Sequence, residues 1–167
     1  MNTRKKLLLG LCSALLLVGC GKTAVENAME HQIEKETGGN ADVDITANGM
    51  NVKTDKGTVQ TGNQASMPAD WPSDVPAYPG STVQMSGSAN EEEGEDGRLV
   101  MLQSSESVQA VTDFYTQKLT GGGWTIEGNM KIAGSTVIAA KKGGQTLSLQ
   151  VADAGGKTAI TMALGVK

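Results

Sequence analysis

Few side chains in this sequence are suited to catalytic chemistry. The chain holds two cysteines, Cys12 and Cys20, and a single histidine, His31. Nucleophilic catalysis requires a nucleophile, a base and a group that orients the base. His31 is expected on the solvent-facing side of a helix, and the sequence contains no Gly-x-Ser-x-Gly, phosphate-binding or dinucleotide-binding motif. We therefore predict that the protein is not an enzyme, with no catalytic residue and no cofactor.

Cys20 has the most informative surroundings. It follows a basic start, Arg4 to Lys6, and an apolar stretch of 12 residues from Leu7 to Val18. These are the n-region and h-region of a secretory signal peptide, predicted over residues 1–19. The stretch is too short for a lasting membrane span, because a helix needs about 20 residues to cross a bilayer. Its end, Leu17-Val18-Gly19-Cys20, resembles the lipobox of bacterial lipoproteins.

The lipobox resemblance implies lipidation at Cys20. In such lipoproteins a diacylglyceryl group is joined to the thiol, the chain is cleaved before the cysteine, and the new amine is acylated, commonly with palmitate. Two or more acyl chains give stable attachment to a membrane. Gly21 stands where Gram-negative inner-membrane lipoproteins usually carry aspartate, so the resemblance favours the outer membrane, with the protein facing the periplasm. The alternative is an ordinary signal peptide that leaves Cys20 as a free thiol.

The composition of the mature chain limits its partners. Cleavage before Cys20 would leave 148 residues with 11 Lys and Arg against 18 Asp and Glu, a net charge of about −7. Such an acidic chain offers no electrostatic surface for nucleic acid and no polybasic patch for anionic lipid. With Cys12 removed and Cys20 lipidated, stability must come from packing rather than disulfides. We predict membrane attachment through lipid, with an envelope protein as the candidate partner and the oligomeric state left open.

Metal binding and glycan cleavage are the alternatives. Zinc and copper need several Cys or His ligands, which this chain lacks. The acidic run from Glu91 to Asp96 supplies the oxygens that calcium prefers, but without EF-hand spacing. We interpret the run as a solvated loop and predict no metal site, with weak calcium binding as an alternative. A glycan-cleaving enzyme would need two carboxylates about 5–10 Å apart, and Asp113 and Glu127 are the residues to test.

Residues 20–62 are predicted to form a lipidated module with one helix and a β-meander. Thr23 begins a capping box and Gly38-Gly39 provides a stop, so a helix is expected over 23–37. Its apolar stripe, formed by Val25, Met29 and Ile33, needs a surface to lie on. Along another face, like charges four residues apart should weaken the isolated helix. These residues are Glu26, Glu30 and Glu34.

Three strands are expected after that helix, near 42–46, 50–54 and 58–61. Asn48-Gly49 is the strongest hairpin signal in the chain and favours a type I′ turn. As a two-residue loop it would pair Ile45 with Val52, Val43 with Thr54, and Asp44 with Lys53. A second turn near Asp55 to Gly57 would then set Val59 opposite Thr54.

Residues 63–81 contain all four prolines and are predicted to form a strap or linker. The residue before each proline is pushed into extended geometry, which stiffens the segment. Trp71, Val75 and Tyr78 favour a strap packed on the following domain. Recognition of the segment by a partner's aromatic groove is the less favoured alternative.

Residues 82–167 are predicted to form the main domain, with strands at 82–86 and 98–103 before a helix near 106–120 that Ser104 or Ser105 would cap. If Gly143-Gly144 and Gly155-Gly156 are hairpin loops, Leu149 faces Ile138 on one side and Met162 on the other. The order ββαββββ predicts an α+β fold in which one helix covers an antiparallel sheet.

The segments Pro68–Gly80 and Val111–Trp124, the second containing Phe114-Tyr115 and Leu119, carry a further resemblance. They are similar to a group of uncharacterised bacterial lipoproteins that share a prolyl strap and a Phe-Tyr…Leu…Gly-Trp helix–strand signature. The likeness covers most of the mature chain and brings no catalytic or ligand residue with it. It implies a lipid-anchored envelope protein that serves as a non-catalytic binding or structural module.

Overall fold

The computed structural model describes residues 22–90 and 96–166. Within them the chain has an α+β fold with two helices and a nine-stranded antiparallel sheet. The predicted signal peptide, Cys20 and residues 91–95 lie outside the described residues. The elements are α1 (Ala24–Thr37), β1 (Ala41–Thr46), β2 (Gly49–Thr54), β3 (Gly57–Gly62), β4 (Thr82–Ala89), β5 (Asp96–Ser104), α2 (Val108–Gly121), β6 (Thr125–Ile132), β7 (Ser135–Lys142), β8 (Gln145–Asp153) and β9 (Thr158–Val166).

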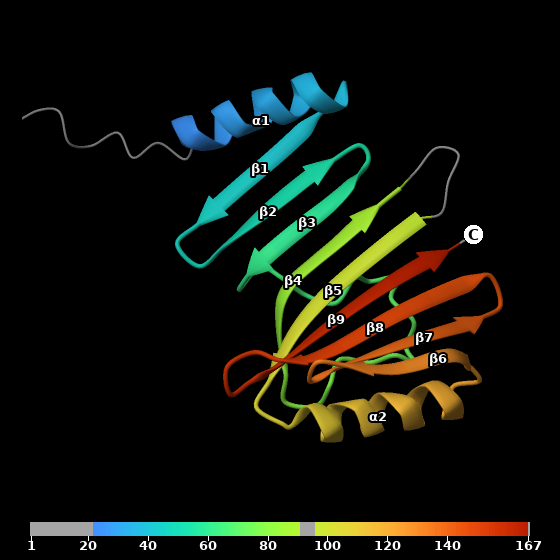
Figure 1. Ribbon diagram of the computed structural model, residues 1–167. Coiled ribbons are helices and arrows are strands. Elements are labelled where there is room, and N and C mark those ends of the chain that lie inside the picture. The colour runs from blue at the N-terminus through green and yellow to red at the C-terminus, as the bar shows by residue number, and fades with distance from the viewer. Residues whose placement is uncertain (1–21, 91–95, 167) are drawn as a thin grey trace, which may run out of the picture.

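The strands follow the order β1-β2-β3-β4-β5-β9-β8-β7-β6 in a single sheet. The last strand, β9, therefore lies between β5 and β8, and β1 and β6 are the two edges. Figure 1 shows α2 below the β6–β8 end and α1 running along β1 at the opposite edge. The pairing of β3 with β4 joins the N-terminal strands to the rest of the sheet.

Across residues 22–90 and 96–166, neither helix has the length and apolar character needed to cross a membrane.

The hydrophobic core lies between α2 and one face of the C-terminal strands. Val111, Tyr115 and Leu119, spaced four residues apart on α2, are fully buried, as a helix over a sheet requires. The registers predicted from the two glycine pairs are observed, since Leu149 pairs with Ile138 on β7 and with Met162 on β9. The helix begins at Val108, two residues later than predicted, because its N-cap is Ser107, which accepts the N–H of Ala110, rather than Ser104 or Ser105.

The segment 63–81, which we call the strap, packs on the same side of the sheet as α2. Val75 is fully buried in the core, and the Trp71 indole donates to the Val75 carbonyl at 2.7 Å. The Tyr115 hydroxyl donates to the Pro76 carbonyl at 3.2 Å, and burial raises the pKa of that phenol. Tyr78 meets the Phe114 ring edge-on, with centroids 5.0 Å apart.

The register predicted for the β1–β2 hairpin is wrong by two residues. Val43 pairs with Val52 and Ile45 with Met50, so Asp44 faces Asn51 instead of the predicted Lys53. The turn lies at residues 47–48, one position earlier than predicted. The two-residue shift keeps each side chain on its predicted face, because alternate residues share a face.

Side-chain chemistry explains the position of this turn. The Thr46 hydroxyl donates to the Gly49 carbonyl at 3.0 Å and accepts the Asn48 N–H at 3.4 Å. Gly49 lies in β2, where a Cβ atom would stand 2.2 Å from the Thr61 carbonyl oxygen. This glycine is therefore needed for close approach of β3 rather than for a left-handed turn.

The next turn repeats the same chemistry eight residues later. The Thr54 hydroxyl donates to the Gly57 carbonyl at 3.2 Å and accepts the Lys56 N–H at 3.2 Å. Thr54 therefore pairs with Gly57 and not with Val59, which is a second two-residue correction. A Cβ atom on Gly57 would stand 2.0 Å from the Ser88 carbonyl oxygen of β4.

Helix α1 covers the outer edge of β1 with carboxylates. An edge strand leaves every second main-chain N–H without a strand partner, and the three glutamates that were expected to weaken the helix accept these groups. Val25, in the predicted apolar stripe, is instead 62 % exposed. The bonds run from Ile45 N–H to Glu26 (2.7 Å), from Val43 N–H to Glu30 (2.7 Å) and from Ala41 N–H to Glu34 (3.4 Å).

Candidate functional site

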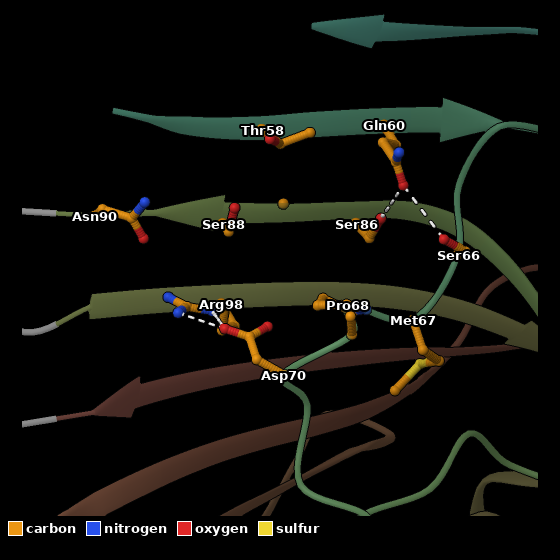
Figure 2. Close-up of a pocket in the computed structure, with 12 residues that line it drawn as sticks. Thr58, Gln60, Ser66, Met67, Pro68, Asp70, Ser86, Ser88, Asn90 and Arg98 are labelled. Atoms are coloured by element: carbon orange, nitrogen blue, oxygen red, sulfur yellow. Dashed lines mark hydrogen bonds and ion pairs between the residues drawn. The ribbon is translucent and has the colours of Figure 1, made fainter. Parts of the chain in front are cut away.

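A polar groove of about 460 Å³ opens where the sheet passes beyond the reach of α2. Its floor is β3, β4 and β5, and its wall is the first part of the strap, as Figure 2 shows. The lining residues are Thr58, Gln60, Ser66, Met67, Pro68, Ala69, Asp70, Ser86, Gly87, Ser88, Asn90 and Arg98.

The groove exists because one face of the sheet changes character along its width. Helix α2 contacts β6, β7 and β8, and residues on that face are apolar there. Towards β4 and β3 the same cross-strand row becomes polar, although Ser86 is still buried and Gln60 is partly buried. In order from β7 to β3, the row is Ile138, Leu149, Met162, Val100, Ser86 and Gln60.

Gln60 holds the floor of the groove to its wall. Its amide oxygen accepts hydrogen bonds from the hydroxyls of Ser86 and Ser66, both at 3.4 Å. Ser86 belongs to β4 and is 3 % exposed, whereas Ser66 belongs to the strap. An amide is not a general base at neutral pH. These serines are therefore arranged to hydrogen-bond rather than to act as nucleophiles.

An ion pair closes the other end of the groove. The Asp70 carboxylate of the strap accepts from Arg98 Nε at 2.7 Å and Nη2 at 2.6 Å. The Arg98 side chain is 11 % exposed, and its Nη2 lies 3.7 Å from the Asp96 carboxylate. The hydrogen bond from Arg98 holds the pKa of Asp70 below its usual value, and the pKa of Arg98 is raised. The charge at this end is thus paired within the protein.

A second carboxylate of the strap, Asp74, binds two side chains on the far side of the core. Asp74 accepts from the Trp124 indole at 3.0 Å and from the ammonium of Lys142. Burial opposes ionisation of Asp74, but these two donors outweigh it and keep its pKa below the usual value. The helix-to-strand connection is tight here, because a Cβ atom on Gly122 would stand 3.0 Å from Asp74.

Three described residues that the sequence singles out for chemistry, His31, Asp113 and Glu127, do not line the groove. The His31 side chain is 85 % exposed on α1, 3.6 Å from Glu34. Asp113 accepts from Gln109 at 2.8 Å, and Glu127 pairs with Lys141 at 3.1 Å. The two acids thus have separate partners on α2 and on β7.

The calcium prediction falls mostly on residues that the structure does not describe. Residues 91–95 lie outside it, and Asp96, which begins β5, lies beside Arg98. Within the described ranges, no three His, Cys, Asp or Glu side chains gather in a way that could hold a metal ion. Calcium binding by the acidic run stays a prediction.

The groove residues were not anticipated as a site. Alternation of polar side chains in β3 and β4, at Thr58, Gln60, Ser86 and Ser88, was a possible signal, because it places four hydrogen-bonding groups on one face. Asp70 and Arg98 are 28 positions apart in the sequence, and no local sequence pattern predicts such a contact.

One comparison with known proteins found a similarity. A family model described as START domain-like matches residues 82–157, which span β4 to the end of β8 together with the loop that follows. A search of the curated proteins found no match. A search of the solved structures also found none.

Proposed function

We propose that this chain is a lipid-anchored bacterial envelope protein that binds an envelope partner in its polar groove and catalyses no reaction. The lipobox-like Leu17–Cys20 supports the anchor, through a diacylglyceryl group on Cys20. In this proposal residues 20–62 carry the anchor, residues 63–81 form the strap, and residues 82–167 are the main domain. The outer membrane, with the protein facing the periplasm, is the location that Gly21 favours.

The single observation that carries the binding role is the groove itself. Its floor supplies hydroxyl and amide groups, and its fixed charges, Asp70 and Arg98, neutralise each other. A neutral hydrogen-bonding segment fits this chemistry better than an anion or cation would, because a charged ligand would have to displace an existing ion pair. The exposed main chain of an extended envelope polypeptide has that character. The similarity to a START domain-like family gives further support, since such domains are typically ligand-binding.

The test of binding is photo-crosslinking in intact cells. A benzophenone amino acid replaces Ser88 in the groove, and a matched probe replaces Gln150, which is exposed and paired with Thr161 outside the groove. We expect a discrete adduct with an envelope protein from position 88 and none from position 150. Equal labelling from both positions, or no adduct at position 88, would reject the groove as the binding site.

The anchor has a separate test. The intact mass of protein purified from membranes should include diacylglyceryl and acyl groups on Cys20. The Cys20→Ala variant should lack them and lose membrane attachment, because the attachment depends on burial of acyl chains. A wild-type mass without any acyl increment would rule out the anchor and leave the groove untouched.

A further inference from the structure

Two apolar side chains are exposed where α1 begins and β1 ends. Val25, in the first turn of α1, is 62 % exposed, and Ile45, near the end of β1, is 37 % exposed. The Ile45 N–H donates to Glu26 at 2.7 Å, which holds the end of β1 against the first turn of α1. Figure 1 shows these two chain segments at the same end of the molecule. We call Val25 and Ile45 with their surroundings the amino-terminal tip.

The described chain is ordered by specific contacts up to its first residue, Lys22. Thr23 is the N-cap of α1 and forms a reciprocal capping box with Glu26. The Lys22 ammonium pairs with Glu30 and Asp42. In the sequence, Gly21 alone separates this fixed residue from Cys20.

The tether between anchor and fold is therefore short. An extended chain spans at most about 3.3–3.6 Å per residue, so the four residues from Cys20 to Ala24 can reach no more than roughly 14 Å. The hydrocarbon core of a bilayer is about 30 Å thick. A lipid on Cys20 would thus hold the amino-terminal tip at the bilayer surface rather than at the end of a flexible linker.

We propose that the amino-terminal tip rests in the membrane interface, with Val25 and Ile45 against the lipid. This inference depends on the proposed lipidation of Cys20. Two partly exposed side chains bury much less apolar surface than acyl chains do, so they do not replace the anchor. Their role is to orient a body that the acyl chains already hold.

The charges at the tip are predominantly negative and do not favour an anionic lipid surface. Glu30 and Asp42 offset the charge of Lys22, and Glu26 is occupied by the N–H groups of Ile45 and Thr23. Asp44, also exposed, adds a negative charge nearby. Attraction to anionic headgroups is thus not what holds the tip, and zwitterionic lipid is the appropriate probe.

The test places one fluorophore at a time on the lipidated protein. The mature chain has no cysteine other than Cys20, so Val25→Cys and Ile45→Cys each give a single site for an environment-sensitive NBD label. Ile132→Cys is the matched control, because Ile132 is 57 % exposed and lies on β6, the opposite edge of the sheet. The proteins are reconstituted into phosphatidylcholine vesicles that contain a lipid-borne nitroxide quencher.

We expect label at positions 25 and 45 to be quenched several-fold more than label at position 132. Equal quenching at all three positions, in protein that floats with the vesicles and carries the acyl mass, would overturn the orientation and leave the anchor intact. Protein without the acyl mass that fails to float would overturn both proposals. If the label at position 25 disturbs α1, quenching of the label at position 45 still measures contact between the tip and the lipid.

Discussion

The two ends of the sheet use helices of the same length in opposite ways. Both α1 and α2 contain 14 residues. Helix α2 lies on a sheet face and buries Val111, Tyr115 and Leu119 completely. Helix α1 lies along a sheet edge and meets it with glutamates that accept main-chain N–H groups. In both helices the contacting side chains are spaced four residues apart. Their types differ because an apolar sheet face requires apolar side chains, whereas a strand edge with free N–H groups requires acceptors.

The same contrast holds for the strands. The C-terminal strands are held by a continuous apolar core. In the N-terminal strands, threonine hydroxyls hydrogen-bond across the turns. Glycines such as Gly49 and Gly57, which lack a side chain, allow the carbonyl of a neighbouring strand to come close. We therefore expect substitutions that remove apolar volume to act mainly at the C-terminal end, and substitutions that disturb polar or backbone contacts to act mainly at the N-terminal end.

The largest effect is expected at the face-covering helix. Tyr115→Ala removes a fully buried ring and should lower the free energy of unfolding by about 3–5 kcal/mol. Tyr115→Phe removes only the hydroxyl that donates to Pro76 and should cost about 1 kcal/mol. Chemical denaturation followed by tryptophan fluorescence measures both. Equal costs for the two variants would contradict the role given to the ring.

A smaller effect is expected where strands meet closely. Gly49→Ala puts a Cβ atom 2.2 Å from the Thr61 carbonyl oxygen, so β2 and β3 must move apart at a cost of about 1–3 kcal/mol. Gly97→Ala in β5 is the control, because nothing lies within 4 Å of its Cβ position. Thermal unfolding measures the stability of both variants. If Gly49→Ala were as stable as Gly97→Ala, close approach of β3 would not explain the glycine at position 49.

A local effect is expected at the covered edge. Replacing Glu26, Glu30 and Glu34 together by alanine removes like-charge repulsion and raises helix propensity. If α1 served only as a helix, this gain would be set against the loss of the Glu26 capping box, and β1 would be unaffected. We expect instead that the amides of residues 41, 43 and 45 exchange faster with deuterium and that the chain self-associates through the uncovered strand.

The control for this variant is Glu36→Ala, which changes an exposed glutamate of the same helix whose partner is Gln32. Exchange measured by mass spectrometry should be unchanged at β1 in that control. Unchanged exchange in the triple variant as well would show that the carboxylates do not hold the edge.

The smallest effect is expected at the ion pair that closes the groove. The folded-state pKa of Asp70 lies below its ordinary value of 3.8, so its contribution to stability is complete above that value and is lost as the pH falls through the lower, folded-state pKa. Because Asp70 is 57 % exposed, Asp70→Asn should cost no more than about 1 kcal/mol at neutral pH. Urea midpoints measured against pH should converge for wild type and variant in strong acid. A stability difference that persists there would contradict this assignment.

The sequence predicts the C-terminal end of the fold better than the N-terminal end, for physical reasons. Gly143-Gly144 specifies the β7–β8 register because two apolar faces agree on it. For the first hairpin, Asn48-Gly49 predicts a turn one position too late, because Gly49 serves a close approach to β3. That approach depends on a third strand, which local sequence does not show.

The candidate site was less predictable than the fold. Gln60 and Ser86 come from strands joined through the long strap, and Asp70 meets Arg98 only once β5 is in place. The sequence shows the glutamates of α1 as a charged line. Their partners are main-chain N–H groups of β1, which nearly every residue type carries, so the sequence does not identify them. Periodicity in the sequence reveals side chains that pack together in one core, whereas the periodicity of side chains that bind backbone does not identify their partners.

The most direct test of binding in the groove is the photo-crosslink from position 88, measured in cells whose probe-bearing protein carries a second substitution. Gln60→Ala removes the amide that joins the floor of the groove to its wall, and Gln32→Ala removes an exposed amide on α1. We predict that the envelope adduct falls several-fold with Gln60→Ala and is unchanged with Gln32→Ala. An adduct of equal yield in both backgrounds would contradict binding in the groove.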